Sequence, residues 1–280
     1  MIERLASADE VPETGAPEAA SRGSTRALRR SLGSVRAALA VLTRIPVADP
    51  GLVTGAPAFG LVGALIGVAG AIPVLAVGEA IPSIGAILAV AAMAGLSGAI
   101  HLDGLADTAD ALVAIGPDAS ERARTDPAVG AAGAVTLILV IAVDVAALTA
   151  VLTGAGSIMA ALACVVAAAT SRAVPPAVAR LASKSVMTTG LAAWFAARVI
   201  ATDVVIALAT AAATALAAAL ATGRAELAIA AGAAVAIGIG ASIGLARVRK
   251  GIDGDLLGAG VELAQAGCLV VVAVLVSWPR

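Results

Sequence analysis

The stretch VGAAGAVTLILVIAVDVAALTAVLT, residues 129–153, decides the fold class of this chain. Asp144 is its single charged residue, and the other positions are apolar, small or threonine. A run of about 20 such residues is long enough to cross a lipid bilayer as a helix. The whole chain of 280 residues has the same character, because 60% of it is hydrophobic and 13% charged. A soluble domain carries roughly 25% charged residues, so the sequence indicates a membrane protein.

Further apolar runs of similar length flank this stretch. The alternating pattern of barrel strands is absent, and helices satisfy their own backbone hydrogen bonds in lipid. We therefore expect an all-α, polytopic helical membrane protein with about seven transmembrane helices, within a range of six to eight. Gly60, Gly63, Gly67 and Gly70 form a small-residue face, which indicates close helix packing. The expected spans lie near residues 58–78, 81–100, 129–153, 157–179, 203–222, 226–246 and 262–279.

The N-terminal segment differs from the rest. Residues 1–33 are rich in Glu, Pro, Ser and Ala and have no apolar core, so we expect a disordered tail there. Residues 34–280 are expected to form a single integral-membrane helical catalytic domain. From Thr25 onward, leucines and Val35 recur at helical spacing with arginines mostly off that stripe. Such a basic amphipathic helix lies on an anionic membrane surface, and the alternative is a short first helix of the bundle.

The basic residues predict the orientation, because Lys and Arg favour the cytoplasmic side of short loops. A cytoplasmic N-terminus leaves only Arg224 and Arg280 of the 18 Lys and Arg on the outer side. Three polar segments, 101–127, 180–202 and 247–261, then share the cytoplasmic face. Aromatic residues are scarce, and we expect Trp194-Phe195 and Trp278 to anchor the protein at the interfaces.

The first polar segment opens with HLDGLADTAD, residues 101–110, which holds three carboxylates and the single histidine of the chain. At roughly 100° per residue, Asp103, Asp107 and Asp110 share one helix face. Like charges at this spacing repel each other, so a solvated acidic face is the less favoured interpretation. Carboxylate oxygens are ligands of Mg²⁺, which binds a few of them together with substrate phosphates and water. The stripe therefore predicts a magnesium site.

Basic residues on the same expected face supply the complementary charge. Arg172, Arg180 and Lys184 bracket the inner end of one expected span, and further basic residues precede Asp253 and Asp255. Guanidinium groups bind phosphate through paired hydrogen bonds. The alternative is ordinary anchoring at the membrane surface, which we prefer for Arg247. Acids that bind a metal opposite basic residues indicate a site for a phosphate or diphosphate.

These motifs together resemble the cobalamin synthase family, adenosylcobinamide-GDP ribazoletransferase. His101 to Asp110 resembles its signature, and the likeness extends over roughly residues 36–278. The segment Leu42-Thr-Arg-Ile-Pro46 resembles the opening of that family. Asp253 stands where the family usually has Thr, and Gln265 where Glu is expected. The other similar segments are Arg122 to Asp126 with Gly130 to Gly133, Ser171 to Arg180, and Gly251 to Ala259.

The resemblance implies a reaction in which α-ribazole, or its 5′-phosphate, attacks the cobinamide-side phosphoryl group of adenosylcobinamide-GDP. GMP leaves, and adenosylcobalamin or its 5′-phosphate forms. In this interpretation Asp103, Asp107 and Asp126 bind Mg²⁺, Asp110 is the leading base and His101 the rival base. His101 has a hydrogen-bonding role at the helix start as its alternative. The substrate-binding residues are then Arg172, Arg180, Lys184, Asp253 and Asp255.

Three other functions remain open at this point. CDP-alcohol phosphotransferases and membrane prenyltransferases also carry Asp-rich motifs and use diphosphates, and a cation-coupled transporter would explain the intramembrane Asp144. We expect a multi-pass protein of the bacterial cytoplasmic membrane with its active site facing the cytoplasm. The expected partners are the two substrates and the lipid bilayer, with no nucleic acid. An oligomer or an association with other corrinoid-pathway enzymes is also open.

Overall fold

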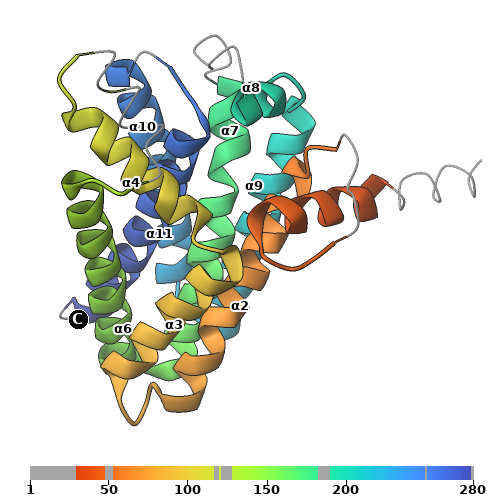
Figure 1. Cartoon of the computed structure of the whole chain (residues 1–280). Helices are drawn as coiled ribbons and strands as arrows, with labels where there is room; N and C mark the ends of the chain where they lie inside the picture. Colours follow the sequence, from red (N-terminus) through yellow and green to blue (C-terminus); the bar gives the residue numbers. More distant parts are fainter. Residues whose placement is uncertain are drawn as a thin grey trace, which may run out of the picture.

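The computed structural model describes residues 30–47, 53–116, 120, 128–181, 190–249 and 251–278. Every element in these ranges is a helix, as the composition predicts (Figure 1). Residues 30–42 are helical. The elements that follow are η1 (Ala56–Ala58), α2 (Phe59–Val77), α3 (Pro82–Ser97), α4 (Ile100–Val113), α6 (Ala131–Arg172), α7 (Val174–Leu181), α8 (Gly190–Ala196), α9 (Ala201–Thr222), α10 (Glu226–Arg249) and α11 (Gly254–Ser277).

The described residues contain 5 helices that are long and apolar enough to cross a membrane, or up to 6 if the bent pair α3 and α4 is one span. A polytopic helical membrane protein is therefore confirmed. The candidates match the expected spans near 58–78, 203–222, 226–246 and 262–279. The longest candidate, Ala131–Leu181, covers the two expected spans 129–153 and 157–179. The number of spans and the cytoplasmic N-terminus stay predictions.

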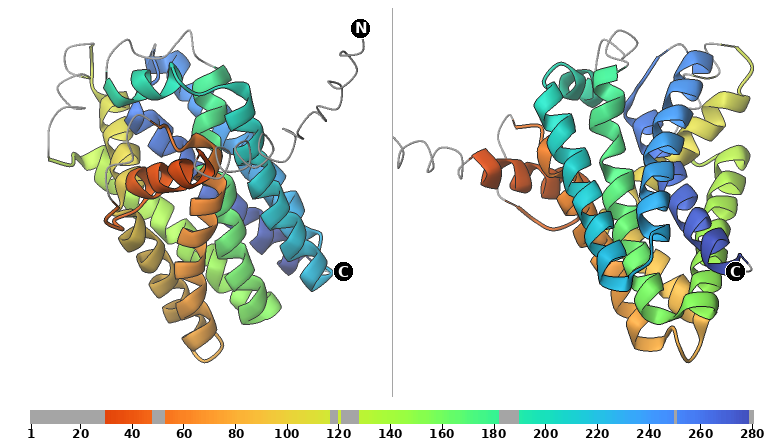
Figure 2. Two further views of the ribbon diagram at one scale, coloured as in Figure 1. Left: turned by 90° about the vertical axis from the view of Figure 1, so that its right-hand side faces the viewer. Right: turned by 180° about the vertical axis from the view of Figure 1, so that it is seen from behind.

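Helix α6 is two limbs that reverse direction at Gly156, which has φ 83° and ψ 174°. In a straight helix, Asp144 and Arg172 would lie about 42 Å apart. Both instead hydrogen bond to the Gln265 side chain of α11. Figure 2 shows the two limbs side by side. The reversal is fixed by Ser157, whose hydroxyl donates to Glu79 Oε1 at 2.7 Å. This hydrogen bond lowers the pKa of Glu79 in the α2–α3 loop.

The chain bends by 92° between α3 and α4. Gly98 (φ 64°) and Ala99 (φ 56°) are both left-handed and interrupt the helix. A residue with a side chain loses about 1–2 kcal/mol in this conformation, so packing must hold Ala99 in place. The expected span 81–100 stays a prediction: α3 alone has 16 residues and reaches about 24 Å, short of the roughly 30 Å hydrocarbon core, and it is long enough only together with α4. The bend turns α4 across the end of the bundle.

Close helix packing on the glycine face of α2 is confirmed. A Cβ on Gly63 would lie 2.4 Å from the Ala168 carbonyl oxygen, and one on Gly67 would lie 2.4 Å from Val165 Cα. The backbones of α2 and the second limb of α6 therefore touch, and they form the centre of the core. Such approach between membrane helices requires small residues.

The helix of residues 30–42 lies across the bundle axis, against the side of the bundle and nearer its middle than α8 (Figures 1 and 2). Ala37, Ala38 and Leu42 are buried against the bundle, whereas Leu32 is exposed. The expected tail of residues 1–33 falls mostly outside the described residues, and its last four residues belong to this helix. The division into a tail and one catalytic domain stays a prediction.

Candidate active site

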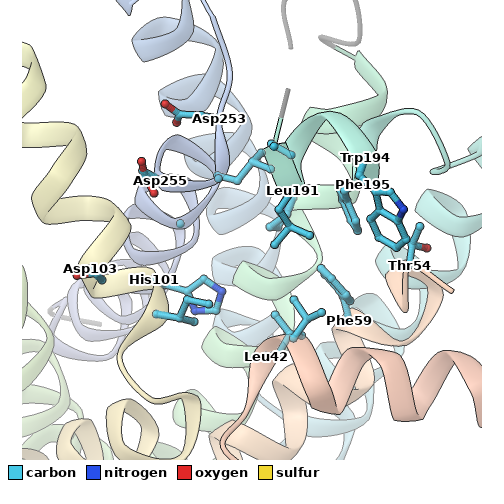
Figure 3. A pocket seen from close by; sticks show the side chains of 18 residues that line it. Leu42, Thr54, Phe59, His101, Asp103, Leu191, Trp194, Phe195, Asp253 and Asp255 are labelled. Carbon is cyan, nitrogen blue, oxygen red and sulfur yellow. The ribbon is translucent and has the colours of Figure 1, made fainter. Parts of the chain in front are cut away.

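Three segments that are far apart in the sequence meet around one cavity of about 430 Å³. They are the start of α4, helix α8 and the N-terminal turn of α11. This is the convergence that the three polar segments predict. Figure 3 shows His101, Asp103, Asp253 and Asp255 on one side of the cavity, and aromatic side chains on the other side. The aromatic side is formed by Phe59, Trp194 and Phe195, with Leu42, Thr54 and Leu191 nearby.

Two glycines let α4 and α11 cross closely enough to bring the acids together. A Cβ on Gly104 would lie 2.8 Å from the backbone oxygen of Asp255, and one on Gly258 would lie 3.3 Å from the Cα of His101. A side chain at Gly104 would push the two helices apart. The signature on α4 and the Asp-containing motif on α11 therefore form one site because a glycine stands at each crossing point.

A second cavity, of about 590 Å³, lies on the other side of Asp103. Its lining includes Arg44 and the bend at Gly98 and Ala99, and it shares Val41, Ile100 and Asp103 with the first cavity. The Arg44 side chain lies over Gly98, since a Cβ there would be 2.1 Å from its Nε. Sequence reasoning did not select Arg44 for the site, although its segment resembles the family's opening motif. The structure places this guanidinium in a cavity that the exposed Asp103 carboxylate also borders.

Asp253 has a structural role besides its place in the first cavity. Its Oδ1 accepts a hydrogen bond from the Leu256 backbone N–H at 3.0 Å and caps α11. Its Oδ2 lies 3.0 Å from Arg249 Nη2. The pair holds the start of α11 against the end of α10. Asp255 follows within the first turn of α11 and also borders the cavity.

Asp110 is bound to the backbone of α6. Its Oδ2 accepts from the Gly130 N–H at 2.7 Å and its Oδ1 from the Gly133 N–H at 2.9 Å. Both groups belong to the first turn of α6, whose N–H groups lack partners within the helix. Asp110 therefore caps α6 from a neighbouring helix. Within the described part of the chain, Asp107 and Asp110 border neither cavity.

Arg172 lies inside the bundle, where 1% of its surface is exposed. Its Nη1 donates to Gln265 Oε1 and, at 2.9 Å, to Ser171 Oγ. Its Nη2 lies 3.9 Å from Glu262 Oε1. Gln265 Nε2 in turn donates to Asp144 Oδ2 at 2.9 Å. We call Asp144, Arg172, Glu262 and Gln265 the intramembrane network. It joins both limbs of α6 to α11 and borders a void of about 10 Å³, and Arg172 lines neither of the two large cavities.

The other expected site residues lie elsewhere. Arg180 is exposed near the end of α7 and borders neither of the two large cavities. Asp126 and Lys184 lie outside the described residues. The structure thus brings together His101, Asp103, Asp253 and Asp255, and it adds Arg44 and the aromatic side of the first cavity.

The acidic side of the cavities fits a magnesium ion that is held mainly through substrate. Among the described residues, no three His, Cys, Asp or Glu side chains are grouped to hold a metal ion by themselves. Mg²⁺ commonly uses one or two carboxylates and completes its coordination with phosphates and water. Asp103 borders both cavities, and Asp107 follows one turn later on α4. Asp103 thus fits such a mode of binding, whereas Asp107 lies outside the lining of both cavities.

Fold and site together define a helical membrane protein with a cavity whose lining includes one histidine and three aspartates opposite a group of aromatic side chains. Residues 34–273 match the family described as cobalamin-5-phosphate synthase. The chain belongs to this family.

Curated relatives carry the name adenosylcobinamide-GDP ribazoletransferase. The protein of Brucella anthropi is 36% identical over 151 residues, which are 50% of this chain and 58% of the relative. The protein of Pseudomonas paraeruginosa is 39% identical over 140 residues, 46% of this chain and 56% of the relative. That of Brucella ovis is 33% identical over 153 residues, 51% of this chain and 58% of the relative. The chain thus aligns with little more than half the length of these relatives. No solved structure matches the chain.

Proposed function

We propose that the protein joins adenosylcobinamide-GDP and α-ribazole, or α-ribazole 5′-phosphate, and releases GMP. The product is adenosylcobalamin or its 5′-phosphate, and the reaction is magnesium-dependent. The observation that carries the proposal is the meeting of His101, Asp103, Asp253 and Asp255 around one cavity beside Arg44. Family membership and the names of the relatives support the same reaction.

The two cavities suit a reaction between two substrates. A ribose hydroxyl of α-ribazole forms a new bond to the cobinamide-side phosphorus, and the phosphorus–oxygen bond to the departing GMP breaks. In our proposal the guanidinium of Arg44 binds the diphosphate from the second cavity, because Arg pairs with phosphate oxygens. Asp103 lies between the two cavities, where the reacting groups meet. Positioning of this kind supplies much of the rate of phosphoryl transfer.

We propose His101 as the base that takes the hydroxyl proton. The imidazole borders the first cavity, and its Nδ1 is buried without a hydrogen-bond partner in the described part of the chain. Buried polar atoms without a partner are rare, and a ligand hydroxyl supplies one. Asp110 is the weaker candidate, because both its oxygens accept hydrogen bonds from α6. We propose that it positions α6 against α4.

Magnesium, when bound at Asp103 and Asp107, would neutralise charge on the diphosphate oxygens and on the leaving GMP. Asp126 is a further proposed ligand. Asp253 and Asp255 are proposed to bind substrate hydroxyl groups from the start of α11. We further propose that the cavities face the cytoplasm of a bacterial cell, where water-soluble nucleotides enter from the inner side of the membrane.

A panel of donors tests the proposed function. Purified protein in nanodiscs receives α-ribazole and Mg²⁺ with adenosylcobinamide-GDP, a CDP-alcohol or a prenyl diphosphate. We expect GMP and a new corrinoid with the first donor alone. Release of CMP or of inorganic diphosphate from the others would instead assign the protein to another class of diphosphate-using transferase. Cation flux in liposomes without any chemical turnover would identify a transporter.

A further inference from the structure

The first cavity has two chemically different sides. Phe59 and Phe195 stack with their ring centres 5.5 Å apart and their planes 19° from parallel. Trp194 adds a third ring and is held by Arg198, whose Cζ lies 4.8 Å from the ring centre. The opposite side carries His101 and three carboxylates (Figure 3). The cavity therefore suits a ligand with an apolar, flat half and a hydroxyl-bearing half.

The chain has only two Phe and two Trp and no Tyr in 280 residues. Both phenylalanines and one of the tryptophans line this single cavity. Anchoring at the membrane interface, which the sequence suggests for Trp194 and Phe195, does not explain why rings from η1–α2 and from α8 face the same cavity. Aromatic rings provide flat surfaces on which the bases of nucleosides stack. The clustering points to a bound aromatic ring.

We propose that Phe59, Trp194 and Phe195 form the subsite for the benzimidazole base of α-ribazole. This inference rests on the proposed function and deepens it. The volume of about 430 Å³ lies in the range of small-molecule pockets. With the base among the rings, the ribose lies at His101 and Asp103, where the proposed base takes the hydroxyl proton. Trp194 and Phe195 thereby determine which nucleoside is accepted.

The other aromatic base in the reaction is the guanine of the donor, and the side chains immediately beside the rings match its polar edge poorly. The edge of guanine carries several hydrogen-bond donors and acceptors, which lose their water on burial and need partners. The side chains next to the rings are Leu42, Leu191 and Thr54; the Thr54 Oγ1 accepts from the Ala56 N–H at 3.3 Å and retains a single O–H donor. The edge of a benzimidazole is apolar and can be buried there without hydrogen-bond partners.

Tryptophan fluorescence provides a direct test. Trp278, at the far end of α11, is 70% exposed and lies about 30 Å along the helix from Gly258, the last residue of α11 that lines the cavity. In the full-length Trp278→Phe protein in nanodiscs, Trp194 is therefore the single tryptophan. We expect α-ribazole to change its emission in a saturable way and guanosine at equal concentration to leave it unchanged. A response to guanosine and none to α-ribazole would assign the rings to the donor, and no response to either would overturn the subsite.

Kinetics separate this subsite from the proposed function. Trp194→Ala should raise the KM for α-ribazole about fivefold or more, because removal of the stacking between a base and one aromatic ring weakens binding by at least about that factor. The KM for adenosylcobinamide-GDP should stay unchanged. Trp278→Ala is the matched control and should change neither. Trp194→Phe keeps a ring and should restore most of the loss. An unchanged KM for α-ribazole in a folded, active Trp194→Ala protein would refute the subsite. Saturable binding of α-ribazole without turnover of any donor would support the subsite and refute the transferase.

Discussion

Arg172 offers a sharp prediction because sequence and structure give it different roles. The sequence suggests a phosphate-binding residue, whereas the structure places it within the intramembrane network. Replacing Arg172 with Met removes the cation and leaves Glu262 and Asp144 buried, with 5% and 2% of their surface exposed. Breaking a buried ion pair by removing one partner costs about 3–5 kcal/mol. We expect the free energy of unfolding of Arg172→Met to fall by that amount.

The double variant Arg172→Met with Glu262→Gln tests the origin of this loss. Neutralising Glu262 removes the acid that the cation compensates, so the double variant should recover about 0.5–3 kcal/mol relative to additivity. The assay is equilibrium unfolding in mixed detergent and SDS micelles, with turnover measured on the folded fraction. Turnover per folded molecule should stay within a few-fold of the parent. A stable Arg172→Met protein that has lost turnover, with no recovery in the double variant, would show that Arg172 binds phosphate after all.

Substitutions at three further residues, Asp110, Gly156 and Gly104, test the positions of the helices. Asp110→Asn should keep most of the turnover in steady-state kinetics. Asp110→Ala should lose about 1 kcal/mol of stability, because Asp110 caps α6. Loss of turnover in a stable Asp110→Asn protein would restore Asp110 as the base. Gly156→Ala places a side chain on a backbone conformation that almost only glycine adopts, so it should lower the free energy of unfolding by about 1–3 kcal/mol. Gly154→Ala is the control and should lower it little, because the nearest atom to the added Cβ would be 3.7 Å away. Gly104→Ala should separate α4 from α11 and abolish most turnover in a folded protein, while Gly95→Ala, which meets open space, should leave it intact.

The helical membrane fold could be predicted from the sequence, because the length of the apolar runs alone indicates membrane-spanning helices. The runs near 58–78 and 203–222 are uninterrupted, and α2 and α9 lie there. The break between 153 and 157 likewise marked the reversal at Gly156. The bend at Gly98 and Ala99 was not predicted, because Ala99 adopts a left-handed conformation that its sequence does not favour. Tertiary packing determines that conformation.

The candidate site could be predicted in part. The carboxylates of Asp103 and Asp255 stood out because charge is rare in such a chain, and the structure brings them together. The partners of Asp110 and Arg172 could not be inferred, because each binds a helix that lies 20 or more residues away in the sequence. Arg44 could have been selected from its segment, but its place beside Asp103 depends on the bend before α4.

The central claim is that the acids of the two cavities catalyse transfer between adenosylcobinamide-GDP and α-ribazole. Its most direct test measures GMP and corrinoid product together, with purified protein, both substrates and limiting Mg²⁺. We expect equal amounts of the two products. Asp103→Asn should reduce turnover about 100-fold or more, which corresponds to roughly 2.7 kcal/mol of transition-state stabilisation. Asp203→Asn, in the first turn of α9 and outside the lining of both cavities, should leave turnover unchanged. Folded protein that forms no corrinoid product, or an Asp103→Asn variant with the parent's turnover, would contradict the account.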